Sequence, residues 1–277
     1  MQLFTIIEIE THNLCTRKCW FCKHGQVRQD ESTAFMPDDL IRKISDNLQD
    51  LGFRGRISPY SINEPFLDPR IPDIIRLFRS KCPESFISLA SNGDLLSETL
   101  YQSLLVAGLD ALGLSVYDDS SWKRLKAYAC YSDVRIIDYR RRKFENRGGE
   151  VKRGTFSPLT DRSCHRPFGM MVIRATGDVV LCCSDMYSDV VIGNVVDQRL
   201  EEIWESEKFQ RCRSLLLSPT HRKGLKLCQA CSHDGSACLT RFPFENFEWI
   251  PEPLRGLLYR WTPPGVRAFV KRTLGKE

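Results

Sequence analysis

The sequence predicts an α/β protein built on a parallel sheet, followed by a smaller region made of a β-hairpin and a helix. Over the first ~140 residues, short β-like runs alternate with helical stretches, as βαβ units do. Near Asn146 a polar, glycine-containing stretch interrupts this alternation. The 12 cysteines gather largely on either side of that interruption. We therefore divide the chain into residues 1–150, residues 151–240 and a basic tail over 241–277.

The elements follow from the hydrophobic pattern. Strands are expected at residues 4–10, 56–60, 86–90 and 111–117, and helices between them at 37–51, 71–80 and 97–107. Beyond the interruption, the runs 168–174 and 178–183 are joined by Ala175-Thr176-Gly177, which predicts a hairpin. Apolar residues at helical spacing then predict one helix over 200–216.

The composition limits the class of protein. With 277 residues, 42% of them hydrophobic, the chain can bury a sizeable core, and its net charge of +5 is too mild to indicate nucleic-acid binding. The first residues lack the basic start of a signal peptide, and no apolar run is long enough to span a bilayer. These features predict a cytoplasmic location, where clustered cysteines more often bind metal or do redox chemistry than form disulfides.

The first cysteine group directly follows the first expected strand. Cys15, Cys19 and Cys22 have the spacing C-x3-C-x2-C, and thiolates this close on one loop converge on one metal or cluster. Three ligands leave one position of a four-iron cluster open. A closed zinc site would need a fourth ligand, which His12 or His24 could supply.

This spacing after the first strand, with the aromatic Phe21 before the last cysteine, resembles the radical SAM superfamily. The resemblance implies a partial (β/α)6 TIM-like barrel and a [4Fe–4S] cluster whose open iron binds S-adenosyl-L-methionine. It also implies cleavage of that cofactor to a 5′-deoxyadenosyl radical. In the same comparison, Asn63 and Glu64 match a Gly-Gly-Glu-Pro segment that has lost its glycines here. Asn92 and Ser115 match further cofactor contacts.

The second cysteine group lies beyond the interruption and comprises Cys164, Cys182, Cys228 and Cys231. Four thiolates could fill a [4Fe–4S] cluster or a structural zinc site, and ligand type alone leaves both open. The layout resembles the SPASM/twitch extension of radical SAM enzymes, in its shorter form with one auxiliary cluster. Cys183 and Cys238 adjoin these ligands and could substitute for one of them.

Size and cysteine layout resemble twitch enzymes that oxidise an alcohol of an aminocyclitol to a ketone. The resemblance implies that the auxiliary cluster accepts an electron and that an external reductant, such as flavodoxin or ferredoxin, supplies the first one. It places Arg147 at the substrate oxygen, and Glu8 and Tyr60 are further candidates on the first two strands. The alternatives are a peptide-modifying maturase and a non-enzymatic zinc-binding module. The basic tail could touch a membrane, although packing on the barrel is the more common role of such a tail.

Overall fold

The computed structural model describes residues 3–25, 34–140, 144–217 and 221–236. The chain separates into two compact units, Met1–Arg241 and Phe242–Glu277. The second unit, which contains the predicted basic tail and its possible membrane contact, lies outside the described residues, as does Cys238.

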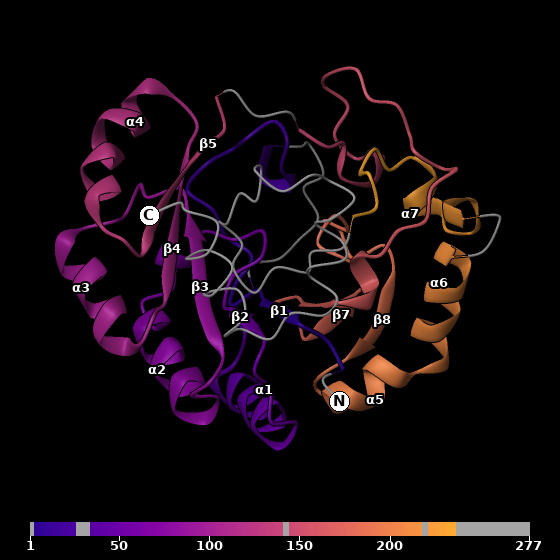
Figure 1. The fold of residues 1–277 in the computed structure, drawn as a ribbon, viewed down its shortest axis with the longest axis horizontal. Coiled ribbons are helices and arrows are strands. Elements are labelled where there is room, and N and C mark those ends of the chain that lie inside the picture. The colour runs from indigo at the N-terminus through magenta and orange to yellow at the C-terminus, as the bar shows by residue number, and fades with distance from the viewer. Residues whose placement is uncertain (1–2, 26–33, 141–143, 218–220, 237–277) are drawn as a thin grey trace, which may run out of the picture. The chain divides into compact units, whose positions relative to one another are not determined.

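The first unit is organised around one sheet (Figure 1). Its strands are β1 (Ile6–Ile9), β2 (Arg56–Ser58), β3 (Phe86–Ser91), β4 (Ala111–Val116), β5 (Val134–Asp138), β6 (Met170–Ile173), β7 (Asp178–Val180) and β8 (Val191–Asn194). They lie in the order β5-β4-β3-β2-β1-β6-β7-β8. The neighbours from β5 to β6 pair in parallel, whereas β7 and β8 are antiparallel additions. Five parallel strands therefore precede the interruption near Asn146, and β6 follows it.

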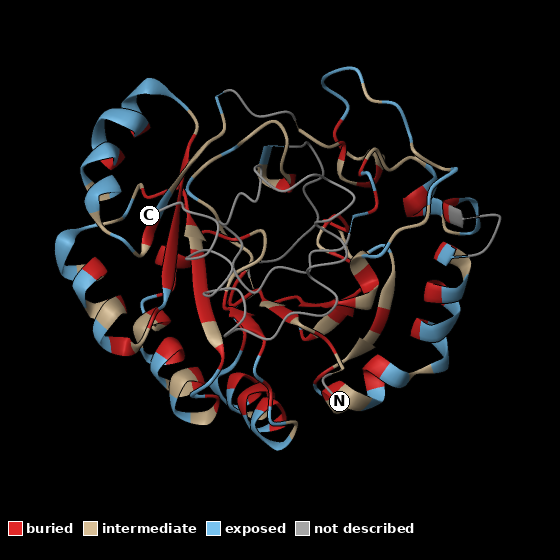
Figure 2. Cartoon of the chain, in the orientation of Figure 1, coloured by how far each residue is buried: buried red, intermediate tan, exposed pale blue. Residues whose placement is uncertain are grey.

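Helices cover the outer face of this curved sheet (Figure 1). They are α1 (Asp38–Asp50), α2 (Ile71–Lys81), α3 (Glu98–Ala107), α4 (Asp119–Leu125), α5 (Leu200–Glu205) and α6 (Glu207–Leu217). The short helix α7 (Lys226–Gln229) lies apart from the sheet and carries Cys228. Each long helix buries one stripe and exposes the other (Figure 2). In α3, the Ser97 side chain caps the first turn and Gly108, at φ +100°, ends the helix in the left-handed region.

The two faces of the sheet bury different residues. Ile7, Ile9 and Ile57 point into the main core with the helices, whereas Ile6 packs with Met170, Val172 and Val180 on the inner face. Because side chains alternate along a strand, Glu8 and Glu10 share the inner face with Ile6. The inner face is thus apolar at the amino end of β1 and acidic toward its carboxyl end. A ligand site with polar contacts is expected at that carboxyl end.

The α/β class, the parallel sheet and the predicted hairpin are confirmed. Arg174 N donates to the Asp178 carbonyl at 2.8 Å and closes the β6–β7 turn. The prediction of one helix over 200–216 is wrong, because Ser206 adopts an extended ψ of 144° and separates α5 from α6. The Ser206 hydroxyl accepts a hydrogen bond from Phe209 N at 3.3 Å, so it caps α6 instead of continuing α5. The sequence reading also missed α4, β5 and β8.

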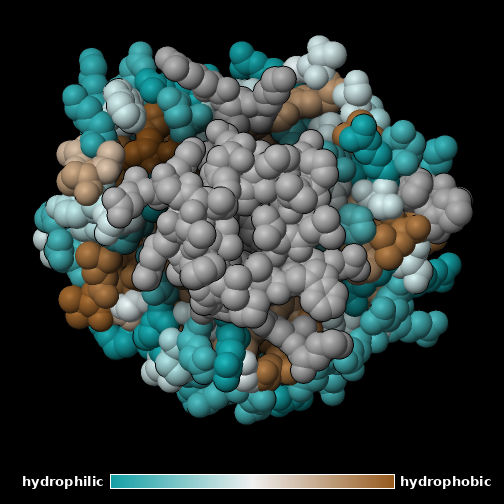
Figure 3. Space-filling view, viewed as in Figure 1, coloured by the Kyte–Doolittle hydropathy of each residue, from teal (hydrophilic) through white to brown (hydrophobic). Residues whose placement is uncertain are grey.

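The surface gives no sign of a broad apolar face among the residues that the structure describes. The large apolar side chains exposed there are Phe35, Leu95, Val106, Trp122, Val196 and Leu217. In Figure 3 the brown patches are separate and lie among teal side chains. No helix in the described part of the chain is long and apolar enough to cross a membrane.

Candidate functional site

The first three cysteines lie on the loop that follows β1. Cys15, Cys19 and Cys22 are half-buried, and Cys22 N donates to the Cys19 carbonyl at 3.0 Å. The loop then turns into the short 3-10 helix η1 (Lys23–Gly25). A Cβ on Gly25 would lie 2.0 Å from the Cys19 carbonyl oxygen, so only glycine fits there. The predicted C-x3-C-x2-C segment is therefore a tight loop closed by a glycine.

The thiols of this loop lie close enough to influence one another. Burial, together with the neighbouring Cys22 and Cys19 thiols, raises the pKa of Cys15 to about 12. Burial and Cys22 raise the pKa of Cys19 to about 11. Without a metal, Cys15 and Cys19 are protonated at neutral pH. A bound metal or cluster would be needed to stabilise them as thiolates.

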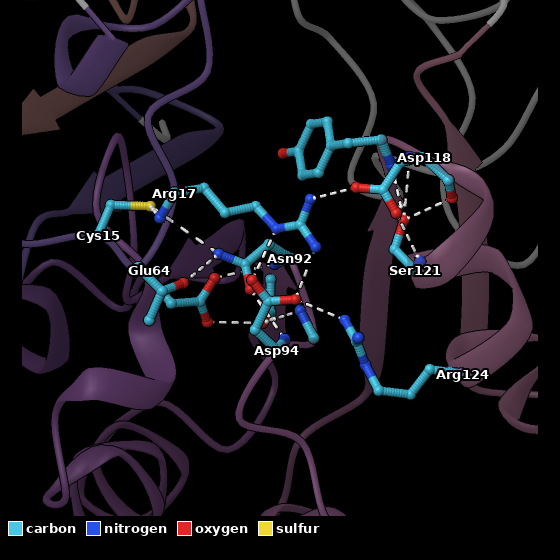
Figure 4. A network of polar contacts seen from close by, with 12 residues as sticks. Cys15, Arg17, Glu64, Asn92, Asp94, Asp118, Ser121 and Arg124 are labelled. Carbon is cyan, nitrogen blue, oxygen red and sulfur yellow. Dashed lines mark hydrogen bonds and ion pairs between the residues drawn. The ribbon is translucent and has the colours of Figure 1, made fainter.

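A network of charged side chains fixes this loop to the sheet (Figure 4). Arg17, between the first two cysteines, donates to both oxygens of Asp94, at 2.6 and 2.7 Å, and to Asp118 at 2.9 Å. Arg124 from α4 reaches the same Asp94. Asp94 follows β3 and Asp118 follows β4, so one arginine joins the cysteine loop to the carboxyl ends of two strands.

Glu64 and Asn92 hold the same loop from the other side. Glu64 accepts from Ser91 Oγ at 2.6 Å and from Asn92 N at 2.9 Å, and its own N–H donates to Leu14 O at 2.9 Å. The Asn92 amide donates to Thr16 Oγ1 at 2.9 Å and lies 3.9 Å from Cys15 Sγ. Burial raises the pKa of Glu64. Both residues, predicted as cofactor contacts, thus also have a structural role in this end of the barrel.

Asn63 differs from its neighbour Glu64 because it keeps an unused donor. Its side-chain oxygen accepts from Ser61 N at 2.9 Å, but its buried amide nitrogen has no partner among the described residues. A buried donor without a partner is costly unless a ligand satisfies it. Asn63 therefore fits a contact to a polar group of a bound cofactor.

Phe21 and Ser115, the other predicted cofactor residues, lie next to an aromatic group. Phe21 stacks on Phe144 at 4.1 Å between ring centroids and lies 5.8 Å from both Tyr117 and Tyr139. Ser115 is buried on β4 within hydrogen-bonding reach of the Tyr117 hydroxyl. This group forms an apolar wall beside the first cysteine loop.

The four cysteines of the second group come together in one cavity. Cys164, Cys182, Cys228 and Cys231 all line it, with Gly148, Arg166, Ser184, Arg222 and His233 among their neighbours. Burial raises the pKa of Cys182 well above its ordinary value, and burial with the Cys231 and Cys164 thiols raises that of Cys228 to about 12. Burial lowers the pKa of His233 to about 4, so this imidazole is neutral.

The arrangement of these thiols can be compared with the needs of a zinc ion and of a [4Fe–4S] cluster. Among residues 3–236, with the gaps given above, no group of three His, Cys, Asp or Glu side chains is close enough to hold one metal ion. A zinc site needs four ligands at about 2.0–2.3 Å from a single ion. A [4Fe–4S] cluster spreads its four thiolates over four separate irons. Four thiols distributed around one cavity, as those of the second group are, suit such a cluster.

Cys183 follows Cys182 but packs on the inner face of the sheet. Its side chain packs against the inner-face group of Ile6, Met170, Val172 and Val180, and its Sγ accepts from Arg166 Nη1 at 3.4 Å. Elsewhere, Cys82 and Cys212 are buried in the main core. Cys183 thus points toward the barrel interior.

Arg147 lies close to both cysteine groups. It adopts φ +48° within η4 (Arg147–Gly149), and its Nη1 donates to the Cys183 carbonyl at 3.3 Å. Burial alone would lower the pKa of Arg147, but the nearby Cys183 and Cys22 thiols raise it overall. A guanidinium in this position stays charged. It lies in electrostatic reach of Cys22 and is hydrogen-bonded to Cys183, the residue after Cys182.

Glu8 and Tyr60 have different surroundings. Glu8 is half-buried on the inner face and accepts from Ser61 Oγ at 3.3 Å, while Arg174 Nη1 donates to the same hydroxyl at 3.0 Å. Tyr60 follows β2 and packs against the main core. The structure thus brings Glu8 into a polar chain on the inner face.

Sequence reasoning missed the buried charges beside Glu8. Glu10 lies 3.6 Å from Lys23 Nζ and 4.0 Å from Arg174 Nη1, and all three side chains are buried. Lys23 follows the last cysteine of the first loop, and Arg174 ends the run Met-Met-Val-Ile-Arg. In the sequence, such residues can be recognised as charged residues that directly follow an apolar run.

Comparisons with known proteins agree with this geometry. The model of the radical SAM superfamily matches residues 9–127, and that of the SPASM iron–sulfur cluster-binding domain matches residues 164–232. The S-adenosyl-L-methionine-dependent 2-deoxy-scyllo-inosamine dehydrogenase of Niallia circulans is 27% identical over 237 residues, which are 84% of this chain and 94% of that protein.

Two solved structures have the same fold. BtrN in complex with AdoMet and 2-DOIA is 26% identical, with a TM-score of 0.76 over 87% of this chain and 96% of that one. BtrN in an open conformation is 25% identical, with a TM-score of 0.66 over 83% and 93%. The two family models together cover more than half of the sequence, and each contains one of the two cysteine groups. Residues 9–127 therefore belong to the radical SAM superfamily, and residues 164–232 form an iron–sulfur cluster-binding region of the SPASM type.

Proposed function

We propose that this enzyme oxidises an alcohol of a sugar or aminocyclitol to a ketone and passes one electron to an auxiliary [4Fe–4S] cluster. The observation that carries this proposal is that Arg147 lies in electrostatic reach of Cys22, in the first group, while its Nη1 donates to the carbonyl of Cys183, the residue after Cys182. A substrate oxygen bound there would lie between an oxidising radical and an electron acceptor. The likeness to an aminocyclitol dehydrogenase supports the same reaction.

The cysteines divide between two clusters in this proposal. Cys15, Cys19 and Cys22 would hold the first cluster, and the remaining ligands would be Cys164, Cys182, Cys228 and Cys231. When bound, the first cluster and S-adenosyl-L-methionine supply a hydrogen-abstracting radical, and the second cluster supplies an electron acceptor. Asn63, Glu64 and Asn92, with Phe21 and Ser115, would line the cofactor site. Residues 1–150 would form the barrel and 151–240 the auxiliary domain.

The chain's own residues have three tasks at the substrate. We assign Arg147 to binding and polarising the hydroxyl oxygen, because its raised pKa makes it a donor and not a base. Glu8 is the carboxylate on the inner face, and we assign to it the hydroxyl proton. Ser61 and Arg174 orient that carboxylate through their hydrogen bonds. Oxidation then balances: the substrate loses one hydrogen atom, one proton and one electron.

The decisive test counts irons after anaerobic reconstitution. Wild type should bind about eight irons and about eight sulfides, four per cluster. Cys15→Ala/Cys19→Ala/Cys22→Ala should bind about four, and Cys164→Ala/Cys182→Ala/Cys228→Ala should also bind about four. A colourless, zinc-containing protein would support the zinc-module alternative. About four irons in the wild type would mean that only one cluster is bound and that the proposed electron acceptor is missing.

Substrate class is tested next with the loaded enzyme. 2-Deoxy-scyllo-inosamine, the compound in the relative's name, should give one ketone per 5′-deoxyadenosine released. An external reductant such as flavodoxin or ferredoxin should support turnover. Turnover of a co-purifying peptide and no turnover of polyols would favour the maturase alternative.

A further inference from the structure

Arg222 is a fully buried guanidinium in the second cysteine cavity. Its exposed fraction is 0%, and it is the largest of the fully buried side chains in the described part of the chain. It lies in the 3-10 helix η6 (His221–Gly224) and lines the cavity together with Cys164, Cys228 and Cys231. Burying a charge is costly unless hydrogen bonds and an opposite charge compensate for it.

Arg222 joins the two segments that carry cysteines. Its Nε donates to the Arg162 carbonyl at 3.1 Å and its Nη2 to the Ser163 carbonyl at 3.4 Å, directly before Cys164. Its Nη1 donates to the His233 carbonyl, two residues after Cys231. One side chain thus spans the gap between ligands that lie far apart in sequence.

Gly235 packs so closely against the Arg222 contact that a side chain has no room there. It adopts φ +88°, and a Cβ there would lie 2.1 Å from the Ser163 carbonyl oxygen and 2.5 Å from Arg222 Nη2. Gly235 O also accepts from His165 N at 2.8 Å. The chain therefore closes tightly over Arg222 from the side of the last cysteine pair.

The hydrogen bonds of Arg222 go to neutral carbonyls. Within the described residues, no carboxylate lies within ion-pair distance of its guanidinium. Arg166, the other arginine of the cavity, lies 3.5 Å from the Glu145 carboxylate. The charge of Arg166 is therefore compensated by the protein, whereas that of Arg222 is not. The groups in the cavity able to compensate it are the cysteines, once they are thiolates.

We propose that Arg222 is the buried counter-charge of the auxiliary cluster, that it ties together the segments bearing Cys164 and Cys231, and that it raises the cluster's reduction potential. This inference rests on the proposed function, because it assigns the four thiolates to an electron-accepting cluster. A cluster with four thiolate ligands is an anion, and reduction makes it more negative. A fixed positive charge in a low-dielectric cavity stabilises the reduced state more than the oxidised one.

The test uses full-length protein in the Cys15→Ala/Cys19→Ala/Cys22→Ala background, where the auxiliary cluster alone gives a signal. Arg222→Gln removes the charge and keeps an amide donor for the carbonyls, whereas Arg222→Lys keeps the charge and loses the three-way contact. Arg213→Met is the matched control. Arg213 is also buried and bound to two carbonyls, but it packs on the rings of Trp204 and Phe209.

The readouts are iron per chain and a potentiometric titration of the cluster followed by electron paramagnetic resonance. We expect Arg222→Gln to lower the equilibrium constant for reduction at least tenfold, which is 59 mV for one electron. Arg222→Lys should lower it less, and Arg213→Met should leave it unchanged. Loss of iron in Arg222→Gln, with iron kept in Arg222→Lys and Arg213→Met, would also support the proposal.

Two results would overturn the proposal. One is an unchanged potential in Arg222→Gln with its iron intact. The other is equal loss of iron in both Arg222 variants and in the Arg213→Met control, which would mark general loss of fold. If the proposed function itself is wrong and there is no auxiliary cluster, the result differs from both of these. The Cys15→Ala/Cys19→Ala/Cys22→Ala protein would then bind no iron even with Arg222 in place.

Discussion

Arg17 donates hydrogen bonds to both carboxylate oxygens of Asp94, at 2.6 Å from Nε and 2.7 Å from Nη2. Arg17 lies between the first two cysteines, and Asp94 follows β3. Such a two-point contact fixes direction as well as distance. It therefore sets how the cysteine loop lies over the carboxyl end of the barrel, before any cluster is bound.

Replacing this arginine should loosen the loop. We expect Arg17→Ala to lower the free energy of unfolding by about 1–3 kcal/mol, because charge-assisted hydrogen bonds to a partly buried carboxylate are lost. Iron bound by the first cluster should fall as well. Urea unfolding and iron counts measure the two effects. Arg124→Ala is the control, since Arg124 binds the same Asp94 from the exposed helix α4. Equal iron loss in both variants would contradict the role given to Arg17.

A methyl group at Gly25 should remove the first cluster alone. The added Cβ would lie 2.0 Å from the Cys19 carbonyl oxygen, so the loop must shift to make room. We expect Gly25→Ala to retain about four irons of about eight, those of the second cluster. Gly52→Ala is the control, because Gly52 has φ +56° but no atom within 4 Å of the added Cβ. That variant should keep both clusters and lose only about 1 kcal/mol of stability.

Glu64→Gln should destabilise the metal-free protein, and the size of the effect should depend on pH. The carboxylate accepts from Ser91 Oγ, Asn92 N and Phe66 N, and an amide replaces one of its acceptors with a donor. The expected cost is about 1–3 kcal/mol.

The pH dependence of that cost follows from the raised pKa of Glu64 in the folded state. The stability that this group contributes is fully present below its unfolded pKa of 4.5 and is lost as the pH rises through the folded value. Urea unfolding should therefore give a wider gap between wild type and Glu64→Gln at pH 4.5 than at pH 7.5. Glu205→Gln, at an exposed position, is the control for the substitution itself. A gap that widens with pH for Glu64→Gln would contradict this reading.

Arg147 should act on the substrate without acting on the cofactor. We expect Arg147→Ala to lower kcat/KM for 2-deoxy-scyllo-inosamine by about 100-fold or more, because a hydrogen bond from a charged, half-buried guanidinium to the substrate oxygen is worth about 3 kcal/mol. Arg147→Lys should recover part of that loss. Slow cleavage of S-adenosyl-L-methionine without substrate should be unchanged in both variants. The exposed Arg153→Ala is the control, and a loss of cofactor cleavage in Arg147→Ala would place the residue elsewhere in the mechanism.

The sequence predicts the scaffold well where hydrophobic periodicity is strong. Helix α1 was expected at 37–51 and runs from Asp38 to Asp50, because its apolar stripe at Leu40, Ile41, Ile44 and Leu48 has a clear helical period. Hydrophobic periodicity fails to predict the break at Ser206. Apolar residues at helical spacing continue across it, and the break depends on a cap that its hydroxyl makes to Phe209 N. The competing local hydrogen bond decides the element there.

Motif spacing identified the cysteines, but it could not find the residues that support them. Arg17, Arg174 and Arg222 each hydrogen-bond to a segment distant in sequence, from 59 residues apart for Arg222 and Ser163 to 113 for Arg174 and Ser61. Such contacts leave no periodic signal in a single sequence. The charge of an arginine is visible, but the carbonyl or carboxylate that it binds is not.

The ladder β1–β6–β7 has a mechanical consequence. β1 leads into the first cysteine loop, and β7 leads to Cys182, while main-chain hydrogen bonds pair β1 with β6 and β6 with β7. Main-chain pairing therefore fixes the separation between β1 and β7, the strands from which the first cysteine loop and Cys182 continue. In the proposed reaction, substitutions around the substrate would change which alcohol is accepted and leave this strand spacing unchanged.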